Sequence, residues 1–374
     1  MQFTNAKIFT KDFTFVTGSF CVEDGKFTRV LDTEVAADAI NLEGAVVIPG
    51  LIDVHNHGNS NADFSDGCYD GLKKLAAYLA ANGITSFAPA SMTLPYETLA
   101  AAFATARQLV DEAPEGCAAL RGIQMEGPFF SEKKKGAQNG AYLKDPDFDA
   151  FKKLYDGCGG LVRIVDLASE LPGAVEFTEQ AKDLCTVSIA HSDSDYEHAK
   201  AVFEAGATHL THLFNAMPPI HHRKPGVIGA ASECEAVRAE IIADGIHVHP
   251  SSIRMAFRLF PDRMILISDA LRCCGMPDGE YELGGQTVYL KGKTCTLADG
   301  TLAGSVTNLY DCMCNAISYG IAPEQAVRAA SWNAACSLGC EDKVGAIADG
   351  MQADFIVCDE NWTRKAVYLA GKKL

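Results

Sequence analysis

Histidines and acidic residues stand at the ends of several short apolar runs, and their chemistry points first to metal binding. Imidazole and carboxylate groups are the ligands that zinc, iron and related divalent ions take in proteins. Each residue alone has an ordinary alternative, either a loop histidine or the first exposed residue after a strand. Their combination is the stronger signal and predicts a divalent-metal site. The six candidate ligands are His55, His57, Glu126, His191, His212 and Asp269.

The spacing of the histidines indicates which side chains can share a site. Residues two apart on a strand point to the same side, so His55 and His57 face one side together. His209 and His212 have opposite parity, so only one of them can face that cavity. We expect His212, which is nearer the end of its apolar run, to be the ligand and His209 to be packed or solvent-facing.

The elements that must position these residues alternate along the middle of the chain. Short apolar runs are separated by helix-like segments, which is typical of βα units around a parallel sheet. Eight such units predict a (β/α)₈ barrel, with the candidate ligands at the carboxyl ends of the strands, where such barrels carry chemistry. The expected strands are Val46–His55, Ile84–Ala90, Arg121–Glu126, Val162–Leu167, Thr186–His191, Thr208–Leu213, Ala239–Ala243 and Met264–Asp269.

Both ends of the chain have a different pattern, with short strands separated by turns. The Asp24-Gly25 pair between two apolar runs is a strong hairpin signal. We therefore predict an α/β fold with two parts. Residues 49–344 form the barrel, and residues 1–48 and 345–374 together form a small β-sandwich domain.

Composition limits the classes of function. Of 374 residues, 48% are hydrophobic and 21% charged, which suits a soluble protein with a sizeable core. The sequence shows no signal peptide and no apolar run of membrane-spanning length. Fourteen scattered cysteines lack the paired spacing of a disulfide framework or zinc ribbon, so we expect a reducing, cytoplasmic location. A net charge of −16 disfavours nucleic acid and anionic membranes as partners.

An anionic substrate would need a local basic patch in so acidic a chain. The densest basic cluster is His221-His222-Arg223-Lys224, which Pro225-Gly226 marks as a loop. A solvated charge run is the usual interpretation of such a cluster. Its place after the strand that ends in His212 favours phosphate binding, for which the planar guanidinium of Arg223 is well suited.

Longer motifs resemble those of the N-acetylglucosamine-6-phosphate deacetylases of the amidohydrolase superfamily. The resemblance extends in order over almost the whole chain, and the His-Leu-Phe-Asn-Ala-Met stretch is distinctive for this branch. The matching segments are residues 49–58, 125–130, 190–192, 211–217, 222–226, 243–247, 268–270 and 300–305.

The resemblance implies a metal-dependent hydrolase that converts N-acetyl-D-glucosamine 6-phosphate to D-glucosamine 6-phosphate and acetate. Glu126, His191 and His212 would bind the main metal ion. Some members have lost the His-x-His pair and use one metal. This chain retains the pair, so the resemblance implies a second ion held by His55 and His57 with Glu126 and Asp269. The cofactor would be one or two ions of zinc, iron or a similar metal per chain, with Asp269 as catalytic base and then acid.

The resemblance also implies the residues that contact the phosphorylated amino sugar. They are Ala137, Gln138, Asn215, Ala216, Arg223, His247, Leu302, Ala303 and Gly304. Family members have His or Gln at the position of Gln138, and where it is His it helps to polarise the substrate carbonyl. With Gln here, that role passes to a neutral amide donor or to the second metal. The family is usually homodimeric, with phosphate contacts that can cross the interface.

Three alternatives stay open at this point. A related amidohydrolase could act on a cyclic amide or an aminopurine, although the basic loop weighs against this. The substrate could be N-acetylgalactosamine 6-phosphate, because few contacts read the orientation of one hydroxyl. A non-catalytic amidohydrolase-like scaffold could work by oligomerising, but such proteins typically lose metal ligands that this chain keeps.

Overall fold

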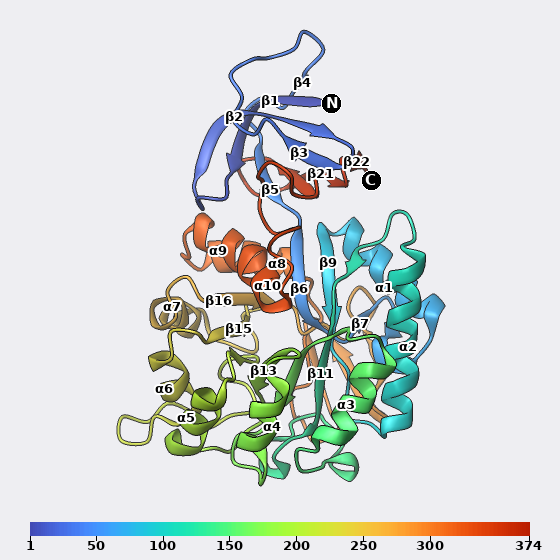
Figure 1. The fold of residues 1–374 in the computed structure, drawn as a ribbon, viewed down its shortest axis with the longest axis vertical. Coiled ribbons are helices and arrows are strands. Elements are labelled where there is room, and N and C mark those ends of the chain that lie inside the picture. Colours follow the sequence, from blue (N-terminus) through green and yellow to red (C-terminus); the bar gives the residue numbers. More distant parts are fainter.

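Eight parallel strands from the middle of the chain form a barrel in the computed structural model, which describes all 374 residues (Figure 1). They lie in two sheets, which an isolated bridge between Ala90 and Gln124 joins on one side. On the other side, the backbone N–H of Asp269 donates to the carbonyl of His55 at 2.9 Å. The strands are β6 (Leu51–Asn56), β9 (Ile84–Pro89), β11 (Ile123–Phe129), β12 (Val162–Leu167), β13 (Thr186–Ile189), β14 (His209–Leu210), β15 (Arg238–Ile242) and β16 (Met264–Ile267).

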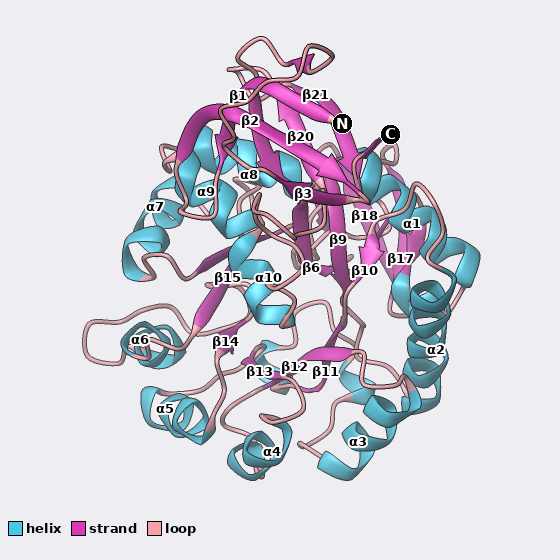
Figure 2. Cartoon of the chain, turned by 45° about the horizontal axis from the view of Figure 1, so that its top comes forward, coloured by secondary structure: helices cyan, strands magenta, loops and turns pink.

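Helices surround this barrel, as the tilted view in Figure 2 shows for α2 to α7. Their apolar residues recur at helical spacing, as in α2, which buries Leu99, Phe103 and Ala106. Capping fixes their starts; the Asp147 carboxylate, for example, accepts the Ala150 N–H at the start of α3. The helices are α1 (Tyr69–Ala81), α2 (Tyr96–Glu112), α3 (Phe148–Gly157), α4 (Ala174–Ala181), α5 (Tyr196–Ala205), α6 (Gly226–Glu233), α7 (Pro250–Leu259), α8 (Leu309–Ser318), α9 (Pro323–Ala330) and α10 (Trp332–Leu338). None of them has the length and apolar composition needed to cross a membrane.

The strand that we expected over Val46–His55 is in fact two strands in two different sheets. β5 (Val46–Pro49) pairs with strands of the terminal sheet, whereas β6 begins at Leu51 and pairs with β9. The break falls at Gly50, where a Cβ atom would lie 2.1 Å from Oγ1 of Thr85. Only glycine allows the chain to pass so close to β9 as it leaves one sheet and enters the next.

The two ends of the chain share one eight-stranded sheet, and both termini lie beside it in Figure 1. The order is β22-β21-β20-β5-β1-β2-β3, and β4 pairs with β1. Phe20 of β2 and Phe355 of β20 have ring centroids only 5.2 Å apart although β5 and β1 lie between their strands. The sheet must therefore curl around its own core. The remaining strands are β1 (Gln2–Phe9), β2 (Phe15–Glu23), β3 (Lys26–Thr28), β4 (Ile40–Asn41), β20 (Phe355–Cys358), β21 (Arg364–Leu369) and β22 (Lys372–Lys373).

A three-stranded antiparallel sheet between β16 and α8 was not predicted from the sequence. It consists of β17 (Gly279–Leu283), β18 (Gln286–Lys291) and β19 (Thr294–Thr296). Its inner side chains pack with Met92 and Leu271 in a small apolar cluster of their own. This sheet covers one side of the barrel mouth, beside the cavity described next.

Candidate active site

A cavity of about 300 Å³ lies at the carboxyl ends of the barrel strands. It brings together nearly all of the residues that the sequence singled out. His55 is buried behind its wall, and Arg223 is the one predicted residue that lies away from it. Its lining residues are His57, Met92, Glu126, Gly136, Ala137, Gln138, His191, His212, Asn215, Ala216, His247, Asp269, Leu271, Leu283, Thr301, Leu302, Ala303 and Gly304.

Glu126 is the centre of the first group of candidate ligands. Its Oε1 lies 3.1 Å from Nε2 of His191 and 3.2 Å from Nε2 of His212. The two Nε2 atoms are 3.1 Å apart. All three residues are buried, and they offer two nitrogens and one oxygen to a common point.

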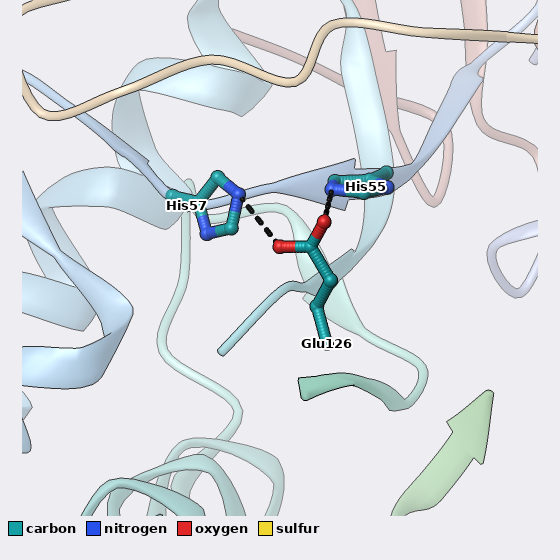
Figure 3. Close-up of side chains that lie close together, drawn as sticks. All are labelled: His55, His57 and Glu126. Carbon is teal, nitrogen blue, oxygen red and sulfur yellow. Dashed lines mark ion pairs between the residues drawn. The ribbon is translucent and has the colours of Figure 1, made fainter. Parts of the chain in front are cut away.

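Glu126 also belongs to the second group, of which Figure 3 shows His55, His57 and Glu126. Nε2 of His57 lies 3.3 Å from Glu126 Oε2 and 3.3 Å from Asp269 Oδ1. Nε2 of His55 lies 3.6 Å from both Glu126 Oε1 and Asp269 Oδ1. Glu126 therefore belongs to both groups and would contribute to each if both held a metal ion.

The orientation of each imidazole is fixed by an acceptor at its outer nitrogen. Nδ1 of His57 lies 3.1 Å from the Ala90 carbonyl, and that of His191 lies 2.8 Å from the Lys134 carbonyl. For His212 the acceptor is the Asn215 carbonyl at 3.2 Å.

For His55 the acceptor is a carboxylate, Glu240, at 3.0 Å. Such outer partners of ligating histidines hold the ring and the tautomer that present Nε2 to a metal.

The electrostatics of the site favour positive charge. Burial opposes the charged form of His55, but Glu240, Glu126 and Asp269 more than offset it and raise its pKa to about 10. Burial likewise opposes the charge of Glu126, yet the surrounding imidazoles hold its pKa well below the usual value. A bound divalent cation would supply the positive charge that these buried carboxylates favour.

The donor set fits such a cation. Nε2 of His55 is buried without a hydrogen-bond partner, although its Nδ1 is bound. A buried, unpaired nitrogen is costly unless something binds it. Four imidazoles with two carboxylates suit zinc, iron or a similar ion.

Three of the candidate ligands have left-handed backbone conformations. φ is +45° at His191, +29° at His212 and +49° at Asp269. Residues other than glycine rarely adopt this conformation, and it concentrates at functional sites. Each of these residues lies two positions past the last residue of a barrel strand, so the turn after the strand carries its side chain to the barrel mouth.

Gln138 is anchored rather than free in the cavity. Its Nε2 donates to Oε2 of Glu126 at 2.8 Å, and its Oε1 accepts the backbone N–H of Thr93 at 2.7 Å. A neutral amide therefore orients the central carboxylate.

His247 and the turn at residues 302–304 form another part of the cavity wall, next to Asp269. Nδ1 of His247 lies 2.7 Å from Asp244 Oδ2, and its Nε2 lies 2.8 Å from the Ala303 carbonyl. Burial opposes the charge of His247, but Asp244 more than offsets it and raises the pKa. A Cβ atom on Gly304 would lie 2.6 Å from the carbonyl oxygen of Asp269, so the turn packs directly against Asp269.

Arg223 lies on an exposed loop that extends from the barrel between β14 and α6 (Figure 1, lower left). All of residues 219–224 are exposed. The guanidinium contacts the neighbouring His222 ring at 2.6 Å and lines no part of the cavity. Within one chain it does not reach the other predicted substrate contacts.

Sequence reasoning missed several buried polar residues beneath the site. Glu240 contacts two histidines, His55 and His209, and His209 is packed rather than solvent-facing. Asp166 accepts hydrogen bonds from Gln124 and Thr211. The signal for both acids was a carboxylate flanked by apolar residues within a predicted strand.

Comparison with known proteins was made for the whole chain. The model of the amidohydrolase family matches residues 46–373. The N-acetylglucosamine-6-phosphate deacetylase of Bacillus subtilis (strain 168) is 36% identical, over 94% of this chain and 91% of its own length. The enzyme of the same name from Homo sapiens is 35% identical, over 100% of this chain and 95% of its own.

Solved structures agree with this result. A mutant N-acetyl-D-glucosamine-6-phosphate deacetylase from Mycobacterium smegmatis, in complex with N-acetyl-D-glucosamine-6-phosphate, has a TM-score of 0.93 at 30% identity, covering 100% of this chain and 98% of that chain. The N-acetylglucosamine-6-phosphate deacetylase from Thermotoga maritima has a TM-score of 0.89 at 25% identity, covering 100% and 99%. The chain belongs to the amidohydrolase family and, within it, to the N-acetylglucosamine-6-phosphate deacetylases.

Proposed function

We propose that this protein hydrolyses N-acetyl-D-glucosamine 6-phosphate to D-glucosamine 6-phosphate and acetate, in amino-sugar catabolism and cell-wall recycling. The observation that carries the proposal is the convergence of four imidazoles and two carboxylates at a cavity that His247 also lines. Relatives with this activity match the chain over nearly its full length.

The cofactor is one or two divalent ions, zinc, iron or a similar metal. Glu126, His191 and His212 would hold the first, and His55, His57, Glu126 and Asp269 the second. When bound, the metal supplies a more acidic water and polarises the acetamide carbonyl.

Asp269 moves the proton in this proposal. Its carboxylate takes a proton from water as the oxygen adds to the carbonyl carbon. It then returns that proton to the sugar nitrogen as the C–N bond breaks, so one group serves as base and then acid. Its position 3.3 Å from Nε2 of His57 keeps the carboxylate at the ligand cluster.

Substrate contacts come from the rest of the cavity. The sugar would lie against Ala137, Gln138, Leu302, Ala303 and Gly304. Asn215, Ala216 and His247 would hold the phosphate side.

We propose that Arg223 completes the phosphate site from the second subunit of a homodimer. The support is its place on an exposed loop and its absence from the lining of its own chain's cavity. A location in the cytoplasm is consistent with fourteen cysteines that are all free.

The direct test is acetate release from a panel of N-acetylated amino sugars by the metal-loaded protein. The panel holds N-acetylglucosamine and N-acetylgalactosamine, each with and without the 6-phosphate. We expect the 6-phosphorylated gluco sugar to have the highest kcat/KM. Higher activity on the galacto sugar would reassign the substrate, and no acetate from any member would refute the proposed reaction.

A further inference from the structure

Glu240 is a wholly buried carboxylate at the centre of β15, between two histidines. Its Oε2 lies 3.0 Å from Nδ1 of His55, and its Oε1 lies 2.9 Å from Nε2 of His209. The backbone N–H of His212 also donates to Oε2, at 3.2 Å. One side chain therefore touches a candidate ligand from each of the two groups.

The contacts of Glu240 continue away from the cavity into a closed network. Nδ1 of His209 lies 3.2 Å from the hydroxyl of Ser337 on α10, and all of these groups are buried. His209 thus occupies the oxygen of Glu240 that His55 leaves free. A buried carboxylate with both oxygens engaged is held in one orientation.

Among the four candidate ligand histidines, His55 is the one whose outer nitrogen meets a carboxylate instead of a backbone carbonyl. The difference matters because the two groups share Glu126, leaving Asp269 as the second group's own acid. Two divalent ions carry twice as much positive charge as the carboxylates of Glu126 and Asp269 together can neutralise. Glu240 is a third carboxylate, behind His55, and it supplies negative charge that the ligands of the second group lack.

We propose that Glu240 is a positioning residue that completes the second metal site by holding His55 with Nε2 toward the ion and by adding negative charge behind it. The proposal rests on the proposed function only in taking the two groups to be metal sites. It concerns affinity for the second ion and does not depend on which sugar is hydrolysed.

The experiment measures metal binding without substrate in the full-length protein. Parent and Glu240→Gln are stripped with chelator, dialysed against buffered free zinc and analysed for metal per chain. We expect the parent to bind two ions. Glu240→Gln should bind the second about 10- to 100-fold more weakly and recover it as free zinc is raised. His55→Ala serves as the reference for loss of the same ion.

Asp166→Asn is the matched control for replacing a buried acid by its amide, because Asp166 is another wholly buried barrel acid and makes no hydrogen bond to a histidine. It should keep both ions at the parent affinity. Glu240→Asp keeps the charge at a shorter reach and should have intermediate affinity for the second ion. It carries the test if Glu240→Gln fails to fold.

Three results would overturn the proposal. They are a parent protein that binds a single ion at saturating zinc, a Glu240→Gln protein with parent affinity for both ions, or an equal loss in Asp166→Asn. Two ions in the parent with no acetate released from any sugar would refute the proposed function and leave the role of Glu240 standing.

Discussion

At the scale of single residues, the site depends on which nitrogen each imidazole turns inward. The sequence indicates that His55 and His57 share a side, because residues two apart on a strand do so. It does not indicate that three outer nitrogens meet backbone carbonyls of loops, because no side chain marks those acceptors. Glu240 escaped notice for a related reason: its partners His55 and His209 lie far away in the sequence.

Asp269 tests the proposed chemistry. Asp269→Asn removes the proton carrier and keeps the shape, so turnover should fall about 100- to 10,000-fold. Binding of the phosphorylated sugar should persist, because Asp269 is not among the proposed phosphate contacts Asn215, Ala216 and His247. Steady-state kinetics, ligand binding and metal content must be measured together, since Asp269 also belongs to the second group of ligands. Turnover close to that of the parent would refute the assignment.

The pair Asp244 and His247 predicts a pH effect. Asp244 raises the pKa of His247, so the cationic ring is present at lower pH and is lost as pH rises through that raised pKa. Asp244→Asn should therefore move the alkaline limb of kcat/KM for the 6-phosphorylated sugar to lower pH. The profile for unphosphorylated N-acetylglucosamine is the control. Equal movement of both profiles would show that His247 does not act on the phosphate.

Asp166 predicts a pH effect on stability. Burial, with the nearby charges of Glu126 and Glu240, raises its pKa to about 8. Between the unfolded value near 4 and about 8, folding takes up a proton, so this group's contribution to stability falls as pH rises through that window. In metal-free protein, Asp166→Asn should be more stable than the parent at pH 9 by a few kcal/mol, and much less so near pH 4. Urea unfolding at both pH values measures the difference, and a difference independent of pH would contradict it.

At the scale of elements, the eight barrel strands were predicted because each is a short apolar run between helix-like segments. The division of Val46–His55 was not, because an apolar run continues unbroken across Gly50 and pattern alone does not say which sheet a strand joins. The small sheet β17–β19 was also missed. Its strands are short and half exposed, so their pattern of apolar residues is weak.

We expect the small sheet β17–β19 to contribute to binding of the sugar. Gln286 of β18 donates to the Ala137 carbonyl at 2.7 Å and so ties the sheet to the loop that carries Gln138. Gln286→Ala removes one hydrogen bond, and KM should rise about two- to tenfold with little change in kcat. Gln180→Ala, which removes a bond on the exposed face of α4, is the control and should change neither value. A fall in kcat with KM unchanged would assign the sheet to the catalytic step instead.

At the scale of the whole molecule, the position of Arg223 is explained if a second copy supplies the cavity that it serves. Mixing Arg223→Ala with Asp269→Asn subunits tests this. In a mixed dimer, the Arg223→Ala subunit keeps Asp269 and receives Arg223 from its partner. Random pairing should restore about one quarter of parent activity from two impaired proteins. Activity no higher than the mean of the two separate variants would place Arg223 in its own subunit's site or outside the site.

The division of the chain at residues 1–48, 49–344 and 345–374 stays a proposal, although the course of the strands supports a border near Gly50. β5 pairs with β1 on one side and β20 on the other, so residues from both ends of the sequence flank it.

The pairing of β5 with both β1 and β20 also determines the order in which the terminal sheet can form during synthesis. The ribosome releases all eight barrel strands by Ile267, whereas β5 obtains its second neighbour only when Phe355–Cys358 emerges. During synthesis, the sheet that contains β1, β2 and β5 therefore has an open edge at β5, even after all eight barrel strands have been made. Such open edges tend to pair with other chains. Residues 355–358 thus close a sheet that residues 2–9 began, so a chain that ended before residue 355 would keep every proposed ligand and leave the edge of β5 unpaired.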